Sequence, residues 1–100
     1  MSKAIAVVED DESIREMLRY YFQSVGYAVR AYESGEALFA SEEGLGLPAL
    51  YILDIMLPQM DGIEVLKLLR AKGIATPVMM LTAKGEKEDR IKGFDTGADD

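Results

Sequence analysis

The chain has 100 residues, of which 49% are hydrophobic and 29% are charged, a balance typical of one soluble globular domain. Its formal net charge of −7 argues against direct nucleic-acid binding, which needs clustered lysine and arginine. The absence of cysteine and histidine excludes thiol chemistry, disulfides, an imidazole base and the commonest ligands of transition metals. No secretion-type apolar region follows Met1, and no apolar run approaches the roughly 20 residues of a membrane span. We therefore expect a cytoplasmic protein that binds neither membrane nor DNA directly.

The first third of the chain predicts strand, helix and strand. Residues 4–8 are continuously apolar, which is typical of an interior parallel strand. Ser13 and Glu16 match a capping box and predict a helix that begins near Ser13 and stops at Gly26. An apolar stripe predicts that this helix packs on the sheet through Ile14, Met17, Leu18, Tyr21, Phe22 and Val25. Residues 27–31, interrupted by Arg30, favour an edge strand beside the first.

The remaining elements continue the alternation. Ser34 predicts the cap of a short helix through Ala40, and a second apolar run, residues 51–53, predicts a buried strand that ends in Asp54. A third helix should bury Gly62, Val65, Leu66 and Leu69. Residues 78–81 predict a fourth strand, and a short charged helix should follow with Ile91 and Phe94 turned inward. This order predicts an α/β fold with a parallel sheet and right-handed crossovers.

Acidic side chains follow two of the predicted strands. Glu9, Asp10 and Asp54 should meet at one edge of the sheet, because parallel strands place their carboxyl ends together. At about 4 Å and an effective dielectric near 20, each like-charge pair costs on the order of 4 kcal/mol, which favours a bound divalent cation. Oxygen ligands without histidine favour Mg²⁺ or Mn²⁺. For the run of acids at 9–12 alone, a solvated helix start is an equally good interpretation, and Asp54 favours the metal site.

A carboxylate beside such an ion can attack a phosphoryl group, which makes Asp54 the candidate nucleophile. Thr82 ends the neighbouring strand, and its hydroxyl could donate to a phosphoryl oxygen and move inward. A lone threonine at a strand end is usually structural. The functional interpretation of Thr82 therefore depends on Asp54 and the two acids beside it.

Several motifs together resemble the receiver domains of two-component response regulators, and especially those that precede a winged-helix DNA-binding domain. They are Val7-Val8-Glu9-Asp10-Asp11, Ile52-Leu53-Asp54-Ile55-Met56-Leu57-Pro58, Met60-Asp61-Gly62, Leu81-Thr82-Ala83 and Gly97-Ala98-Asp99-Asp100. The resemblance implies a flavodoxin-like doubly wound sheet with strand order 2-1-3-4. It also implies that Asp54 accepts a phosphoryl group from a sensor histidine kinase to switch a downstream output such as transcription. By the same resemblance Asp10, Asp54 and the Met56 carbonyl bind Mg²⁺, Glu9 assists through water, and Thr82 is the switch hydroxyl.

The chain departs from that family after Asp100, where receivers continue into a fifth strand with a lysine and a switch aromatic, and then a fifth helix. Lys84 does not match the position of that lysine. We therefore expect residues 1–100 to be a truncated receiver domain whose fifth βα unit is absent. The strand at 78–81 should then be an unpaired edge, which predicts self-association as a dimer or by strand exchange.

Three other interpretations stay open. The chain could be a receiver fragment that is not phosphorylated and acts as a self-associating structural module. A Mg²⁺-dependent aspartyl phosphatase of the haloacid-dehalogenase type needs a second acid two residues after the first, where this chain has Met56, and this argues against an enzyme. A flavodoxin would need a phosphate loop after the first strand, where four acids would repel the phosphate.

Overall fold

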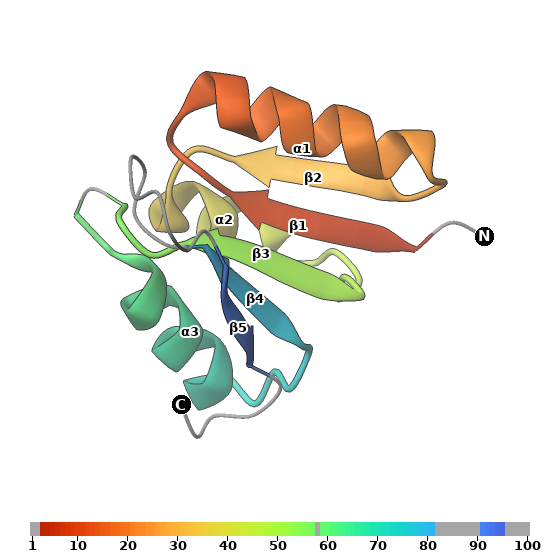
Figure 1. Ribbon diagram of the computed structural model, residues 1–100. Coiled ribbons are helices and arrows are strands. Elements are labelled where there is room, and N and C mark those ends of the chain that lie inside the picture. The colour runs from red at the N-terminus through yellow and green to blue at the C-terminus, as the bar shows by residue number, and fades with distance from the viewer. Residues whose placement is uncertain (1–2, 58, 82–90, 96–100) are drawn as a thin grey trace.

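A central five-stranded sheet organises the molecule (Figure 1), in the order β2-β1-β3-β4-β5. The computed structural model describes residues 3–57, 59–81 and 91–95. The strands are β1 (Ala4–Val8), β2 (Ala28–Tyr32), β3 (Leu50–Asp54), β4 (Val78–Leu81) and β5 (Ile91–Asp95). The first four strands pair in parallel, which confirms the predicted doubly wound sheet with the order 2-1-3-4.

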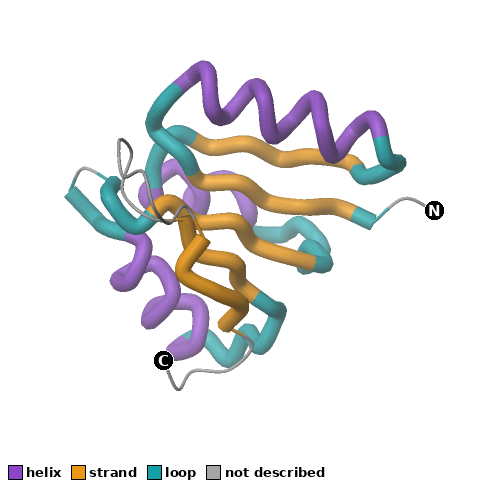
Figure 2. Tube along the Cα trace, viewed as in Figure 1, coloured by secondary structure: helices purple, strands orange, loops and turns teal. Residues whose placement is uncertain are grey.

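Three helices within the described residues cover the two faces of the sheet, α1 (Glu12–Ser24), α2 (Gly35–Glu42) and α3 (Gly62–Ala71). Figures 1 and 2 show α1 on one face, and α2 and α3 on the other. None of these helices is both long enough and apolar enough to cross a bilayer.

The two faces of the sheet have separate cores because side chains alternate along each strand. The core under α2 and α3 contains Leu38, Tyr51, Leu53, Val65 and Leu69 among its buried members. The core under α1 is smaller and is formed by Ile5, Val7 and Ile52, with Leu18 and Phe22 of the helix packed against it. The interior strands are buried on both faces, as their continuous apolar runs predicted.

One predicted helix cap and one predicted helix face agree with the structure, and a second predicted cap differs. Ser34 caps α2 by accepting a hydrogen bond from the Ala37 amide at 3.0 Å, and α3 buries the four predicted residues. The first helix begins at Glu12, one residue before the predicted start near Ser13, but the predicted capping box of Ser13 and Glu16 is wrong. Asp11 is the N-cap and accepts from the Ile14 amide at 3.1 Å, because its carboxylate is the acceptor that reaches the free amides first.

The prediction that the whole apolar stripe of the first helix is core is also wrong. Leu18 and Phe22 contact the sheet, but no residue of α1 is fully buried. Met17, Tyr21 and Val25 are 60%, 56% and 54% exposed. The stripe is wider than the strip of sheet that α1 covers, so its outer residues stay on the surface.

Residues 91–95 correct a further prediction. The inward-facing helix expected around Ile91 and Phe94 is instead strand β5, which pairs with β4 in the antiparallel direction. The predicted unpaired edge at β4 is therefore wrong as well, since β5 satisfies the hydrogen-bonding groups on that side. Self-association stays a prediction, but it loses the unpaired β4 edge on which it was based.

Candidate functional site

The candidate site lies where β1 and β3 end side by side, since Val8 is in register with Leu53. Glu9 follows β1 directly and Asp54 is the last residue of β3. The carboxylate oxygens of Glu9, Asp10 and Asp54 come within 4.8 Å of one another, so the structure brings together the three acids that the sequence predicted.

Burial differs among the three acids. Glu9 is 1% exposed and Asp54 is fully buried, whereas Asp10 lies on the surface. Two carboxylates thus sit in a low-dielectric region with a third at its rim. Such a set of oxygen donors suits a hard divalent cation, which would offset the mutual repulsion of the charges.

Backbone groups hold both buried carboxylates in place. The Asp54 Oδ1 atom accepts a hydrogen bond from the Met56 amide at 3.0 Å, and Glu9 Oε2 accepts one from the Asp11 amide, also at 3.0 Å. The Arg15 guanidinium donates to the Glu9 carbonyl oxygen at 2.8 Å, which ties α1 to the end of β1. The carboxylate orientations are therefore set by the chain turns that follow each strand.

The start of α3, which follows the loop after Asp54, lies close to the Asp54 backbone. Asp61 and Glu64 form a reciprocal capping box, in which each side chain accepts a hydrogen bond from the other residue's amide. The Gly62 amide donates to the Ile55 carbonyl at 3.1 Å. A Cβ atom on Gly62 would lie 2.4 Å from the Asp54 carbonyl oxygen, so only glycine allows α3 to start this close to the site.

Gly62 is a positioning residue whose role was not predicted, since it was expected as part of a family motif and of the buried helix face, and not as a close contact of Asp54. The sequence did contain a signal for this role. A glycine in the first turn of a helix replaces a better helix former and often marks a close approach between backbones.

Of the other predicted site residues, Met56 lies within the described part of the chain and Thr82 lies outside it. The backbone of Met56 lies beside Asp54, as the amide hydrogen bond shows, while its side chain is 58% exposed. Thr82, together with Pro58 and the motif at 97–100, lies outside the described residues.

Comparison with known proteins identifies the family. Residues 5–100 match the family described as "Response regulator receiver domain". This chain belongs to the response regulator receiver family. It is therefore a receiver domain of the two-component type, as the motifs predicted.

Receiver domains in longer proteins are among its relatives. The alkaline phosphatase synthesis transcriptional regulatory protein PhoP of Bacillus subtilis is 45% identical over 100 residues, which cover all of this chain and 41% of PhoP. The transcriptional regulatory protein ResD of the same organism is 46% identical over 99 residues, covering 96% of this chain and 39% of ResD. The chain thus spans about two fifths of these curated relatives.

Solved receiver structures share the fold. The response regulator TrrA from Thermotoga maritima, solved in complex with Mg²⁺ and BeF, is 36% identical with a TM-score of 0.74, over 83% of this chain and 71% of TrrA. The chemotaxis protein CheY4 of Vibrio cholerae is 29% identical with a TM-score of 0.77, over 88% of this chain and 74% of CheY4.

Proposed function

We propose that this receiver domain takes a phosphoryl group from the phosphohistidine of a sensor kinase onto Asp54 and so switches a downstream transcriptional output. The observation that carries the proposal is the buried Asp54 carboxylate at the end of β3, with Glu9 and Asp10 beside it. The transcriptional output rests on the names of relatives such as PhoP, of which this chain covers 41%.

In the proposed reaction, an oxygen of Asp54 attacks the phosphorus atom, the bond between phosphorus and the kinase imidazole breaks, and an acyl phosphate forms. The Met56 amide holds Oδ1 and so fixes the plane of the attacking carboxylate.

The oxygen donors fit Mg²⁺, with Asp10, Asp54 and the Met56 carbonyl as proposed direct ligands and Glu9 acting through water. The ion would neutralise the phosphoryl oxygens during attack. The solved structure of TrrA in complex with Mg²⁺ and BeF supports a Mg²⁺ site in this domain by similarity. Thr82 remains the proposed switch hydroxyl on the strength of the motif alone.

Intact mass measurement after incubation with acetyl phosphate and Mg²⁺ tests the proposal. We expect one phosphoryl group on the native chain and none on Asp54→Asn. Asp61→Asn is a matched control, because it changes a half-buried acid in the same loop and asparagine is an equally good N-cap. Labelling that survives in Asp54→Asn, or a native chain that takes no label, would refute Asp54 as the acceptor.

A further inference from the structure

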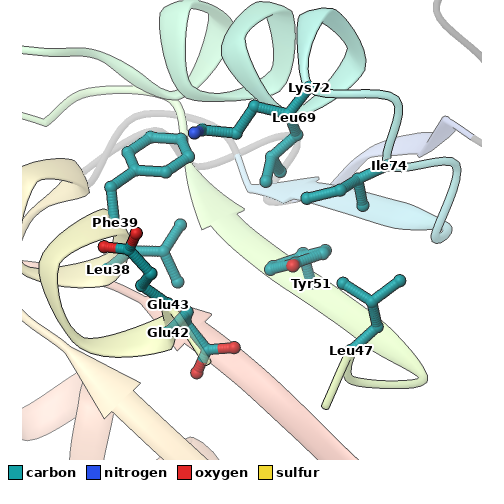
Figure 3. Close-up of a pocket in the computed structure, with 9 residues that line it drawn as sticks. All are labelled: Leu38, Phe39, Glu42, Glu43, Leu47, Tyr51, Leu69, Lys72 and Ile74. Atoms are coloured by element: carbon teal, nitrogen blue, oxygen red, sulfur yellow. The ribbon is translucent and has the colours of Figure 1, made fainter. Parts of the chain in front are cut away.

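A cavity of about 160 Å³ lies between α2 and α3, above the middle of β3 and away from the acidic site (Figure 3). Leu38 and Phe39 of α2 form one wall, and Leu69 and Ile74 form the other. Tyr51 of β3 lies at the floor between them. The lining is mainly apolar, and the described structure therefore leaves a gap in its larger core at this point.

Tyr51 is the unusual member of this lining. Its side chain is only 2% exposed, and its hydroxyl has no hydrogen-bond partner among the described residues. Figure 3 shows the hydroxyl oxygen directed into the space between the two walls. The hydroxyl oxygen itself stays accessible from the cavity, although the rest of the side chain is buried. A β-branched aliphatic residue would suit an interior strand position without placing a hydroxyl there. The cavity thus offers a hydrogen-bonding group that the protein itself does not use.

The Tyr51 hydroxyl is a donor at neutral pH. Burial, and then the nearby charge of Glu42, raise the pKa of Tyr51 above its usual value of 10.0. The group therefore stays protonated and matches a ligand that supplies an acceptor oxygen.

The mouth of the cavity limits the charge of a ligand. Glu42 and Glu43 line it, and the Lys72 ammonium lies 5.7 Å from the centre of the Phe39 ring. Glu43 repels an anion, and the Glu42 carboxylate is already paired with Arg30 at 3.4 Å. The Lys72 ammonium is engaged over an aromatic face. A neutral ligand is favoured by this arrangement.

We propose that the cavity binds a neutral, single-ring aromatic compound that carries a carbonyl group, with the carbonyl oxygen accepting a hydrogen bond from the Tyr51 hydroxyl. The volume fits one ring, since an apolar protein cavity of about 150 Å³ is known to accommodate benzene. Binding here needs no phosphoryl transfer at Asp54, so the proposal stands apart from the proposed function.

Two probes with the same skeleton test this inference, acetophenone and ethylbenzene, because the second replaces the carbonyl group by a methylene. Titration of the ¹⁵N-labelled chain should give saturable shifts for the amides of Phe39, Tyr51 and Ile74. Tyr51→Phe removes only the hydroxyl and should weaken acetophenone binding by about three- to tenfold, the usual effect of one hydrogen bond. Its affinity for ethylbenzene should stay within about twofold.

Tyr20→Phe is the matched control, because it removes a hydroxyl from a side chain that is 77% exposed on α1, on the opposite face of the sheet, and does not line the cavity. It should leave the affinity for both probes unchanged. The absence of saturable shifts from either probe up to its solubility limit would overturn the proposal. So would a Tyr51→Phe variant that loses the same factor for both probes, or that binds acetophenone as tightly as the native chain does.

Discussion

Replacing Gly62 by alanine should destabilise the protein and disturb the acidic site together. A Cβ atom at this position would lie 2.4 Å from the Asp54 carbonyl oxygen and 3.0 Å from the Ile55 Cα atom. Both contacts are with backbone, which cannot rotate away as a side chain could. Overpacking of this kind usually costs about 1–3 kcal/mol.

The higher helix propensity of alanine partly offsets this loss of stability. Alanine is favoured over glycine by about 1 kcal/mol in a helix, which would stabilise Gly62→Ala if the space were open. We therefore expect a net loss of up to about 2 kcal/mol in the free energy of unfolding, measured by urea denaturation followed by circular dichroism. Gly46→Ala is the control, since nothing lies within 4 Å of its Cβ position and its stability should be unchanged or slightly raised.

The same variant should bind Mg²⁺ more weakly, because the displaced backbone is that of Asp54 itself. Calorimetric titration with Mg²⁺ measures this effect directly. A Gly62→Ala protein as stable as the native chain, with an unchanged Mg²⁺ titration, would refute the reasoning. It would mean that α3 can move away from β3 without cost to the site.

Two further predictions concern the charged and phenolic groups. In Mg²⁺-free buffer Asp54→Asn should stabilise the fold by about 1–3 kcal/mol, because it removes repulsion from Glu9 and from the more exposed, more screened Asp10. Thermal unfolding should also lose its dependence on Mg²⁺, and a less stable variant would contradict the electrostatic argument. Tyr32→Phe should lose about 1 kcal/mol with the hydrogen bond to Glu42. Burial, and then that hydrogen bond, raise the pKa of Tyr32 from 10.0 to about 12, so native stability should fall as pH rises through this interval. Urea titrations across this pH range should show a shallower fall in the variant, and identical slopes would contradict the assignment.

Local patterns predicted most of the fold because they coincide with the cores. The continuous apolar runs of β1 and β3 are buried on both faces, and the apolar face of α3 is the face that packs on the sheet. Ser34 and Gly73 also marked the ends of their helices through backbone chemistry that acts within a few residues.

The segment at 91–95 shows where local patterns fail. Ile91 and Phe94 are three residues apart, which suits a helix face, yet the segment pairs with β4 as an antiparallel strand. A strand is stabilised by hydrogen bonds to a partner that lies elsewhere in the chain. The edge of β4 therefore decides that residues 91–95 form a strand. The sequence pattern of five residues contains no information about this partner strand.

The sequence by itself determined which acids meet, because the carboxyl ends of parallel strands share one edge of the sheet and the order of elements fixes that edge. Only the tertiary structure decided that Glu9 is buried while Asp10 is exposed, that Gly62 touches the backbone of Asp54, and that Tyr51 faces a cavity. These features depend on how closely helices and strands approach one another. Such distances follow from the packing of side chains that are far apart in the sequence, and no local pattern encodes them.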